Sequence, residues 1–213
     1  MKVLAKKAQI VSVSAGNAHS VALSQSGKVF VWGFGRLGAL GLGNLQDENF
    51  PRHLRIAEEG VQLENSSESG DSDSPHRLVQ ICAGFDHTCL LDEEGNVFCC
   101  GKVSSYGDIV KRPKRVKLLS PVTQIGAGFQ FSAALTKEGE IFTWKDIEQP
   151  TKFPIAENTE KVISISANSN LVFLTSNENQ TFEKEESKQM YDKESNEEGE
   201  VFVSFRSYDC FDD

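Results

Sequence analysis

Short alternating stretches of apolar and polar residues recur along most of this chain. Ile10-Val11-Ser12-Val13 has the two-residue period of a β-strand, because successive side chains of a strand point to opposite faces. An Ala-Gly pair then interrupts the pattern, and a second apolar run follows at Val21-Ala22-Leu23. Apolar runs this short, punctuated by glycine, disfavour helices. The pattern therefore predicts an all-β fold.

The pattern occurs four times when the chain is aligned to itself. The copies cover residues 10–43, 79–101, 122–144 and 162–182, and they stay in register without internal gaps. The fourth copy is the weakest, with asparagine where the others have glycine. The positions that recur, and that we interpret as structural, are Gly16, His19, Gly27, Trp32, Gly84, His87, Gly95, Gly128, Gly139 and Trp144.

Each copy has the elements of a small antiparallel sheet. Ser-Gly or Glu-Gly after the second apolar run suits a tight hairpin that needs a positive φ. A third strand follows, as at Val29-Phe30-Val31-Trp32. Segments that combine proline with basic residues lie between the copies, which is typical of a fourth, outer edge strand. Three or four strands in about 40–50 residues match one blade of a β-propeller.

The order Ala-Gly-x-x-His-[Ser/Thr]-x-x-Leu, then Gly-x-Val-Phe, then Trp-Gly resembles the repeat of the regulator of chromosome condensation family. The resemblance covers about residues 10–182. It implies antiparallel sheets arranged as a β-propeller of about four blades, incomplete relative to the seven usual in that family. The third copy has Gln130-Phe131 in place of the histidine turn, and the fourth has lost both glycines.

An incomplete ring leaves strand edges and an apolar face uncovered, which invites contact with another chain. Four blades could close on themselves, two half-rings could associate, a partner could supply blades, or the chain could be a truncated version of a longer protein. Residues 200–206 predict one further strand, which could close an edge.

Charge divides the chain into a repeat region and two acidic segments. The net charge is −9, but residues 57–76 contribute −6 and residues 183–213 contribute −7, so the remainder is +4. The composition of the insert at 57–76 and of most of the tail predicts disorder. We thus divide the chain into repeats at 1–182 and a tail at 183–213, with Ser74 as a candidate phosphorylation site before Pro75. The overall charge argues against a DNA-binding protein.

The five cysteines include no Cys-x-x-Cys pair. Cys82, Cys89 and Cys99 fall within apolar strand patterns, so we expect reduced thiols that pack in the core. The sequence shows neither a secretion signal nor a membrane span, and we expect a cytoplasmic or nuclear protein.

Few residues are candidates for chemistry. His19 and His87 recur at one repeat position, as structural residues do, and catalytic residues seldom recur in this way. Asp86 precedes His87 in a loop whose acidic residues face the GTPase in the Ran exchange factor of the family that the repeat resembles. The alternative is an aspartate that stabilises a turn.

One dense basic cluster, Lys111, Arg112, Lys114 and Arg115, could bind an acidic partner or act as a nuclear localisation signal. The alternative is a solvated edge strand. Residues 33–38 read Gly-x-Gly-x-x-Gly but open no helical pattern, and no P-loop motif occurs. We identify no catalytic residue, metal site or cofactor.

These observations favour a non-enzymatic protein–protein interaction module, an adaptor or scaffold. The alternative that the resemblance implies is an exchange factor or regulator of a Ran-like small GTPase. The expected partner is another protein, and the open blade edges could also allow self-association. We do not expect a membrane as a partner.

Overall fold

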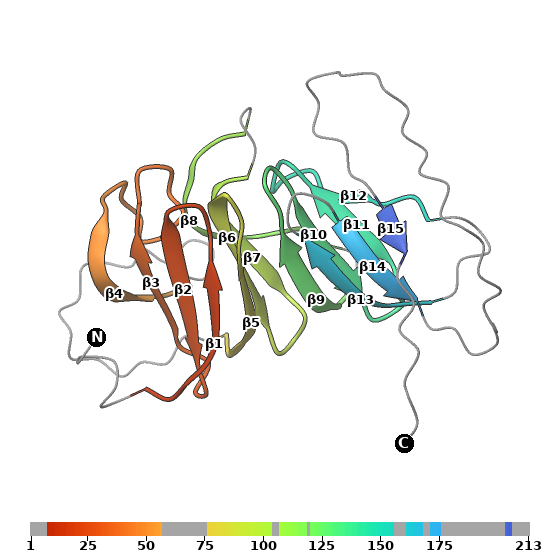
Figure 1. Cartoon of the computed structure of the whole chain (residues 1–213), viewed down its shortest axis with the longest axis horizontal. Helices are drawn as coiled ribbons and strands as arrows, with labels where there is room; N and C mark the ends of the chain where they lie inside the picture. Colours follow the sequence, from red (N-terminus) through yellow and green to blue (C-terminus); the bar gives the residue numbers. More distant parts are fainter. Residues whose placement is uncertain are drawn as a thin grey trace.

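The computed structural model describes residues 8–56, 76–103, 107–118, 120–155, 161–167, 171–175 and 203–205. Every regular element in these ranges is a β-strand, and the strands form four sheets. The sheets lie side by side in a row, with the sheet of the first repeat at one end and that of the fourth at the other (Figure 1). The predicted all-β fold is confirmed.

The first three sheets share one topology, in which four consecutive strands pair antiparallel with their neighbours. The first sheet contains β1 (Ile10–Ala15), β2 (His19–Ser24), β3 (Val29–Gly33) and β4 (Glu48–Leu54). The second contains β5 (Leu78–Ala83), β6 (Asp86–Asp92), β7 (Val97–Lys102) and β8 (Val110–Arg115). The third contains β9 (Val122–Ala127), β10 (Ser132–Thr136), β11 (Ile141–Trp144) and β12 (Thr151–Lys152).

The fourth sheet departs from this topology at its third strand. It contains β13 (Val162–Ala167), β14 (Leu171–Thr175) and β15 (Val203–Phe205). In the other sheets the third strand follows from a hairpin and runs antiparallel, whereas β15 runs parallel to β14. β15 lies within the range 200–206 proposed for a strand, but it extends the fourth sheet and does not pair with the first. Residues 57–75 of the acidic insert, which include Ser74, and the tail at 183–202 and 206–213 lie outside the described residues.

The hairpins between second and third strands show why the repeat needs glycine there. Gly95 has a φ of 86°, in the left-handed region that favours glycine. Its N–H donates to the carbonyl of Asp92, and Oδ1 of Asp92 accepts the N–H of Asn96 at 2.8 Å. Ser24 and Thr136 accept the equivalent N–H groups in the first and third blades. This side-chain cap recurs at a position that the sequence comparison had not singled out.

Proline marks the outermost strand, as expected. Pro51 lies in β4 and Pro113 in β8, each the last strand of its sheet, and Pro150 directly precedes β12. An edge strand pairs with a neighbouring strand on one side only, so not every residue has to donate a backbone N–H. Proline is therefore tolerated there.

Apolar side chains fill the space between successive sheets and form the core. One cluster joins the first two sheets, a second joins the second and third, and a third joins the last two. The first strands of the four sheets are neighbours in order, β1 with β5, β5 with β9 and β9 with β13. Sheets packed face to face along such a row are the blades of an incomplete β-propeller.

The cysteines correct one sequence-based expectation. Cys89 and Cys99 lie directly opposite each other on β6 and β7, with Cα atoms 4.3 Å apart, and form a disulfide instead of two reduced thiols. Both are fully buried, so the expectation that they pack in the core is met. The ten-residue spacing is that of a β-hairpin, and the cross-strand register brings the sulfur atoms together. Cys82 and Cys100 are free thiols.

Candidate functional site

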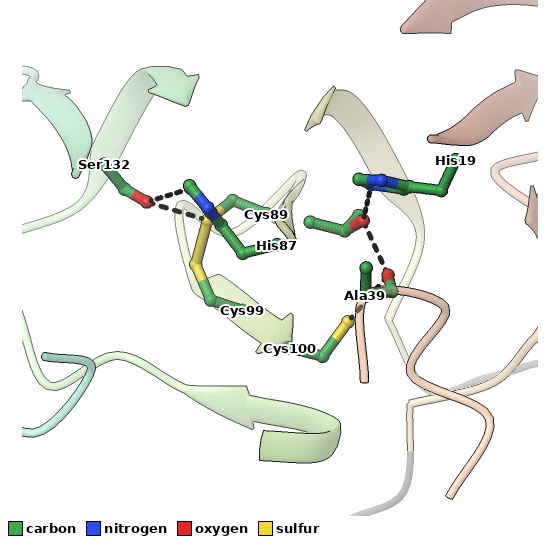
Figure 2. The surroundings of a disulfide bond; sticks show 8 residues. His19, Ala39, His87, Cys89, Cys99, Cys100 and Ser132 are labelled. Carbon is green, nitrogen blue, oxygen red and sulfur yellow. Dashed lines mark hydrogen bonds between the residues drawn. A yellow bond between two sulfur atoms is a disulfide. The ribbon is translucent and has the colours of Figure 1, made fainter. Parts of the chain in front are cut away.

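The Gly-x-x-His turn joins each of the first two blades to the next. Nε2 of His87 lies 2.9 Å from Oγ of Ser132, on the neighbouring blade, and Nε2 of His19 lies 2.9 Å from Oγ1 of Thr88 (Figure 2). Each hydroxyl belongs to the Ser or Thr that follows the histidine position in its own copy. The His87-Thr88 dipeptide of the second blade therefore bonds to both neighbouring blades.

The glycine of the turn makes room for the histidine ring. A Cβ on Gly84 would overlap Cε1 of His87, and one on Gly16 would overlap the ring of His19. The turn is closed by the N–H of Gly84, which donates to the carbonyl of His87 at 2.9 Å. The spacing of glycine and histidine thus follows from local packing.

Both histidines are electrically neutral in the folded protein. Burial lowers the pKa of His19 to about 4, and burial together with the nearby His19 lowers the pKa of His87 to about 3. A buried imidazole that bonds to a hydroxyl is suited to holding two blades together. Both rings are buried, with His19 4% exposed and His87 0% exposed.

The tips of these turns carry two exposed aromatic side chains. Phe85 and Phe129 occupy the same repeat position in adjacent blades, and their rings meet edge to face with centroids 4.5 Å apart. Phe85 is 37% exposed and Phe129 is 49% exposed. Backbone bonds link the turns, from Asn17 N–H to the Phe85 carbonyl and from Phe85 N–H to the Gly128 carbonyl. Backbone hydrogen bonds between the turns therefore hold the aromatic pair in place.

Asp86 borders the same pair in a shallow pocket. The pocket has a volume of about 160 Å³, and its lining includes Leu37, Asp86, Lys102 and both phenylalanines. Asp86 and Lys102 are paired across β6 and β7. Partial burial raises the pKa of the Asp86 carboxyl, and the positive charge of Lys102 opposes the rise. We call Leu37, Phe85, Asp86, Lys102 and Phe129 the turn face.

The sequence pattern points to Asp86 but not to the phenylalanines beside it. The signal was present, because the residue after the first glycine of the turn is Phe in both the second and third copies. Asp86 begins β6 and contributes to the turn, so both of its expected roles remain compatible with its position.

The basic cluster lies elsewhere, on β8, the outermost strand of the second sheet. Lys111, Arg112, Lys114 and Arg115 are all exposed there. Lys114 forms an ion pair with Glu148 of the third blade, and Arg115 donates to the side chain of Asn96. These contacts suit a solvated edge strand, and a role in partner binding stays a prediction.

The glycine-rich loop after β3 leads into no helix in the structure. Instead, Arg36 lies over the ring of Phe34 and near the carboxylate of Asp47, at 3.7 Å. Across the described ranges, no group of three or more His, Cys, Asp or Glu side chains is arranged to hold a metal ion. No helix in those ranges is long and apolar enough to cross a membrane.

Comparison with known proteins identifies the repeat. Residues 26–91, and separately residues 10–39 and 78–108, match the family described as "Regulator of chromosome condensation (RCC1) repeat". The chain contains repeats of the RCC1 type. This confirms the resemblance based on its Gly-x-x-His and Trp-Gly motifs.

The chain is similar to longer proteins with known names. The chain is 36% identical over 134 residues to human "Probable E3 ubiquitin-protein ligase HERC3", covering 59% of this chain and 11% of that one. It is 30% identical over 143 residues to mouse "Regulator of chromosome condensation", covering 63% and 30%. The chain therefore spans less than a third of the length of these two relatives, and the likeness lies in the repeats.

A solved structure shows the same fold. Prp20p from Saccharomyces cerevisiae, studied together with its binding to Gsp1p and histones, matches with a TM-score of 0.59 and 18% identity. The match covers 75% of this chain and 42% of Prp20p. Together with the four stacked sheets, this likeness supports an incomplete propeller.

Proposed function

We propose that this RCC1-repeat chain is a non-enzymatic protein-docking module that binds its partner through the turn face. The observation that carries the proposal is the exposed pair of Phe85 and Phe129, held edge to face on adjacent blades. Aromatic residues are enriched at protein interfaces, where they supply a large apolar area at a small cost in conformational entropy.

The chemistry around the pair supports a protein ligand. Leu37 adds apolar surface, while Asp86 and Lys102 offer one acceptor and one donor group at the rim. An apolar centre with polar groups at its rim is the usual anatomy of a protein interface. The expected partner segment presents an apolar side chain flanked by polar groups.

Comparative affinity capture tests the proposal. We expect Phe85→Ser with Phe129→Ser to remove the bound partner, while Ile163→Ser does not. Ile163 is a suitable control because it is 57% exposed and lies on β13, away from the turn face. Equal capture by the unmodified chain, the double variant and Ile163→Ser would contradict docking through Phe85 and Phe129.

A second candidate function is nucleotide exchange on a Ran-like GTPase. It is favoured by the position of Asp86 in a turn-face loop and by the match to mouse regulator of chromosome condensation. The adaptor proposal predicts no faster release of mant-GDP from such a GTPase. Acceleration that is lost in Asp86→Ala would establish exchange activity instead. A location in the cytoplasm or nucleus remains part of the proposal.

A further inference from the structure

Three of the cysteines lie in one row across the second sheet. Cys82 on β5 is the direct cross-strand partner of Cys89 on β6, and Cys89 is the direct partner of Cys99 on β7. Side chains of directly paired residues lie on the same face of an antiparallel sheet. This face packs towards the third blade, where Cys89 and Cys99 belong to the shared core and Cys82 packs against it. Three sulfur atoms therefore share one face of the second sheet.

The row of cysteines is specific to the second blade. The equivalent cross-strand rows of the first and third sheets are Ser14, Val21 and Val31, and Gly126, Ala133 and Thr143. These rows contain no sulfur, although both sheets pack on the second one. The packing of one blade on the next therefore does not explain why the second blade has three cysteines in line.

The row contains one disulfide and one thiol. Cys89 and Cys99 are bonded and 0% exposed, whereas Cys82 is a free thiol that is only partly buried. The N–H of Gly84 donates to the carbonyl of His87, and hydrogen-bonded pairs alternate along antiparallel strands. Two residues further along, Cys82 and Cys89 form the next such pair, with Cα atoms about 5.5 Å apart, which is a usual separation for a disulfide.

Cys100 is also a free thiol, but it lies on the other face of the sheet. It follows Cys99 on β7, and successive side chains of a strand point to opposite faces. Its Sγ donates to the carbonyl of Ala39 in the first blade, away from the disulfide (Figure 2). Cys100 is therefore a matched control for Cys82.

We infer that Cys82, Cys89 and Cys99 form a thiol–disulfide exchange site in which Cys82 attacks the disulfide. The thiol of Cys82 loses its proton to solvent, and the thiolate forms a bond to Sγ of Cys89. The bond between Cys89 and Cys99 breaks, and Cys99 leaves as a thiolate that takes up a proton. One disulfide and one thiol are present before and after the step, so it needs neither an oxidant nor a reductant.

The exchange moves the covalent link within the blade. Before the step the disulfide joins β6 to β7, and after it the disulfide joins β6 to β5, the first strand of the sheet. A thiolate displaces a sulfur atom along the line of the bond that breaks, and a row across three strands provides this alignment. The site is separate from the turn face and does not depend on docking there.

The acidity of the two free thiols does not distinguish them. Burial raises the pKa of the Cys82 thiol to about 12, and a backbone hydrogen bond from Cys89 opposes the rise. Burial also raises the pKa of Cys100 to about 12. The thiolate of either residue is about a hundredfold more abundant at pH 9 than at pH 7. A difference in reaction between them at pH 9 therefore reports their positions.

Mapping of the disulfide with time tests the inference. The oxidised full chain is held at pH 9, acidified to stop exchange, and alkylated with N-ethylmaleimide in denaturant. Cleavage after Glu94 then separates Cys82 and Cys89 from Cys99 and Cys100. The original disulfide joins the two fragments. The exchanged disulfide leaves them separate, with both cysteines of the second fragment alkylated.

We expect the separate, doubly alkylated fragment to accumulate in the unmodified chain and in Cys100→Ser. In Cys82→Ser its amount should fall at least tenfold, because the attacking thiol is absent. Serine already occupies the equivalent position in the first blade, at Ser14, so the substitution suits the fold. Cys82→Ala is a second variant and is expected to give the same loss.

Three results would overturn the inference. The first is the absence of the doubly alkylated fragment in the unmodified chain. The second is an equal amount of it in Cys82→Ser, or a loss in Cys100→Ser, because another thiol would then be the attacking group. The third is a disulfide that contains Cys100, because it would show that the exchange takes place in unfolded chains.

Discussion

His87 on the second blade and Ser132 on the third are joined by a hydrogen bond of 2.9 Å between Nε2 and Oγ. The pair is fully buried, and Oγ of Ser132 also lies 3.4 Å from Sγ of Cys89 (Figure 2). The same relationship joins His19 to Thr88 one blade earlier. A dipeptide that recurs in the sequence thus makes a polar contact between successive blades.

Removal of the His87 ring should destabilise the protein. We expect His87→Ala to lower the free energy of unfolding by about 2–4 kcal/mol, because it leaves a cavity and removes the imidazole partner of the buried Ser132 hydroxyl. Urea unfolding measures the change. Asn17→Ala, at an exposed turn position, is the control and should change stability by less than about 0.5 kcal/mol. A His87→Ala effect as small as the control would contradict the role of the bond.

Stability should fall as the pH is lowered from 6.5 towards 5. The pKa of His19 is about 4 and that of His87 about 3 in the folded protein, below the ordinary 6.5. Between the pKa in the folded protein and the ordinary 6.5, the unfolded chain binds more protons than the folded protein. Each histidine therefore lowers the free energy of unfolding by about 2 kcal/mol at pH 5. Urea unfolding at pH 7 and pH 5 measures the loss. A variant with His19→Gln and His87→Phe should show a smaller pH dependence, and an unchanged dependence would locate it elsewhere.

Reduction of the disulfide should have a moderate cost. Cys89 and Cys99 are separated by 10 residues, and opening so small a loop is expected to lower the free energy of unfolding by about 2–3 kcal/mol. Unfolding with and without dithiothreitol measures the change. In Cys99→Ser the reductant should have no further effect, because this variant lacks the sulfur atom that pairs with Cys89. Full sensitivity to the reductant in that variant would contradict the pairing.

Gly84→Ala should disturb the turn more than its size suggests. The added Cβ would overlap Cε1 of His87, so either the ring or the turn must move. We expect a loss of about 2 kcal/mol or more in unfolding free energy. Adding His87→Ala to Gly84→Ala should cost less than His87→Ala alone, because the clash is then absent. Additive effects of the two changes would mean that the glycine serves another purpose.

The sequence was sufficient to predict the type of blade. Hairpin glycines such as Gly95, the edge proline Pro113 and the alternating first strand at residues 10–13 are local signals, and each has a local physical cause. The alignment of the copies also predicted the position of each strand within its sheet. The family resemblance rested on the same residues.

The remaining features depend on contacts that a repeat pattern does not contain. The bond from Cys89 to Cys99 needs the cross-strand register, and that from His87 to Ser132 needs the packing of one blade on the next. The parallel pairing of β15 with β14 joins segments about 30 residues apart, and a local hairpin signal does not specify such a pairing. Phe85 and Phe129 could have been noted from their shared column, but only the fold shows that their rings meet.

Site-specific photo-crosslinking tests the central claim, that a protein docks on the turn face, most directly. It detects contacts at the turn face without removing any of them. A photoreactive phenylalanine derivative is placed at position 129, and at position 163 as the control, in the full chain in cells. Docking through the turn face predicts discrete protein adducts at position 129 that are absent at position 163. No adduct at position 129, or the same adducts at both positions, would contradict the proposal.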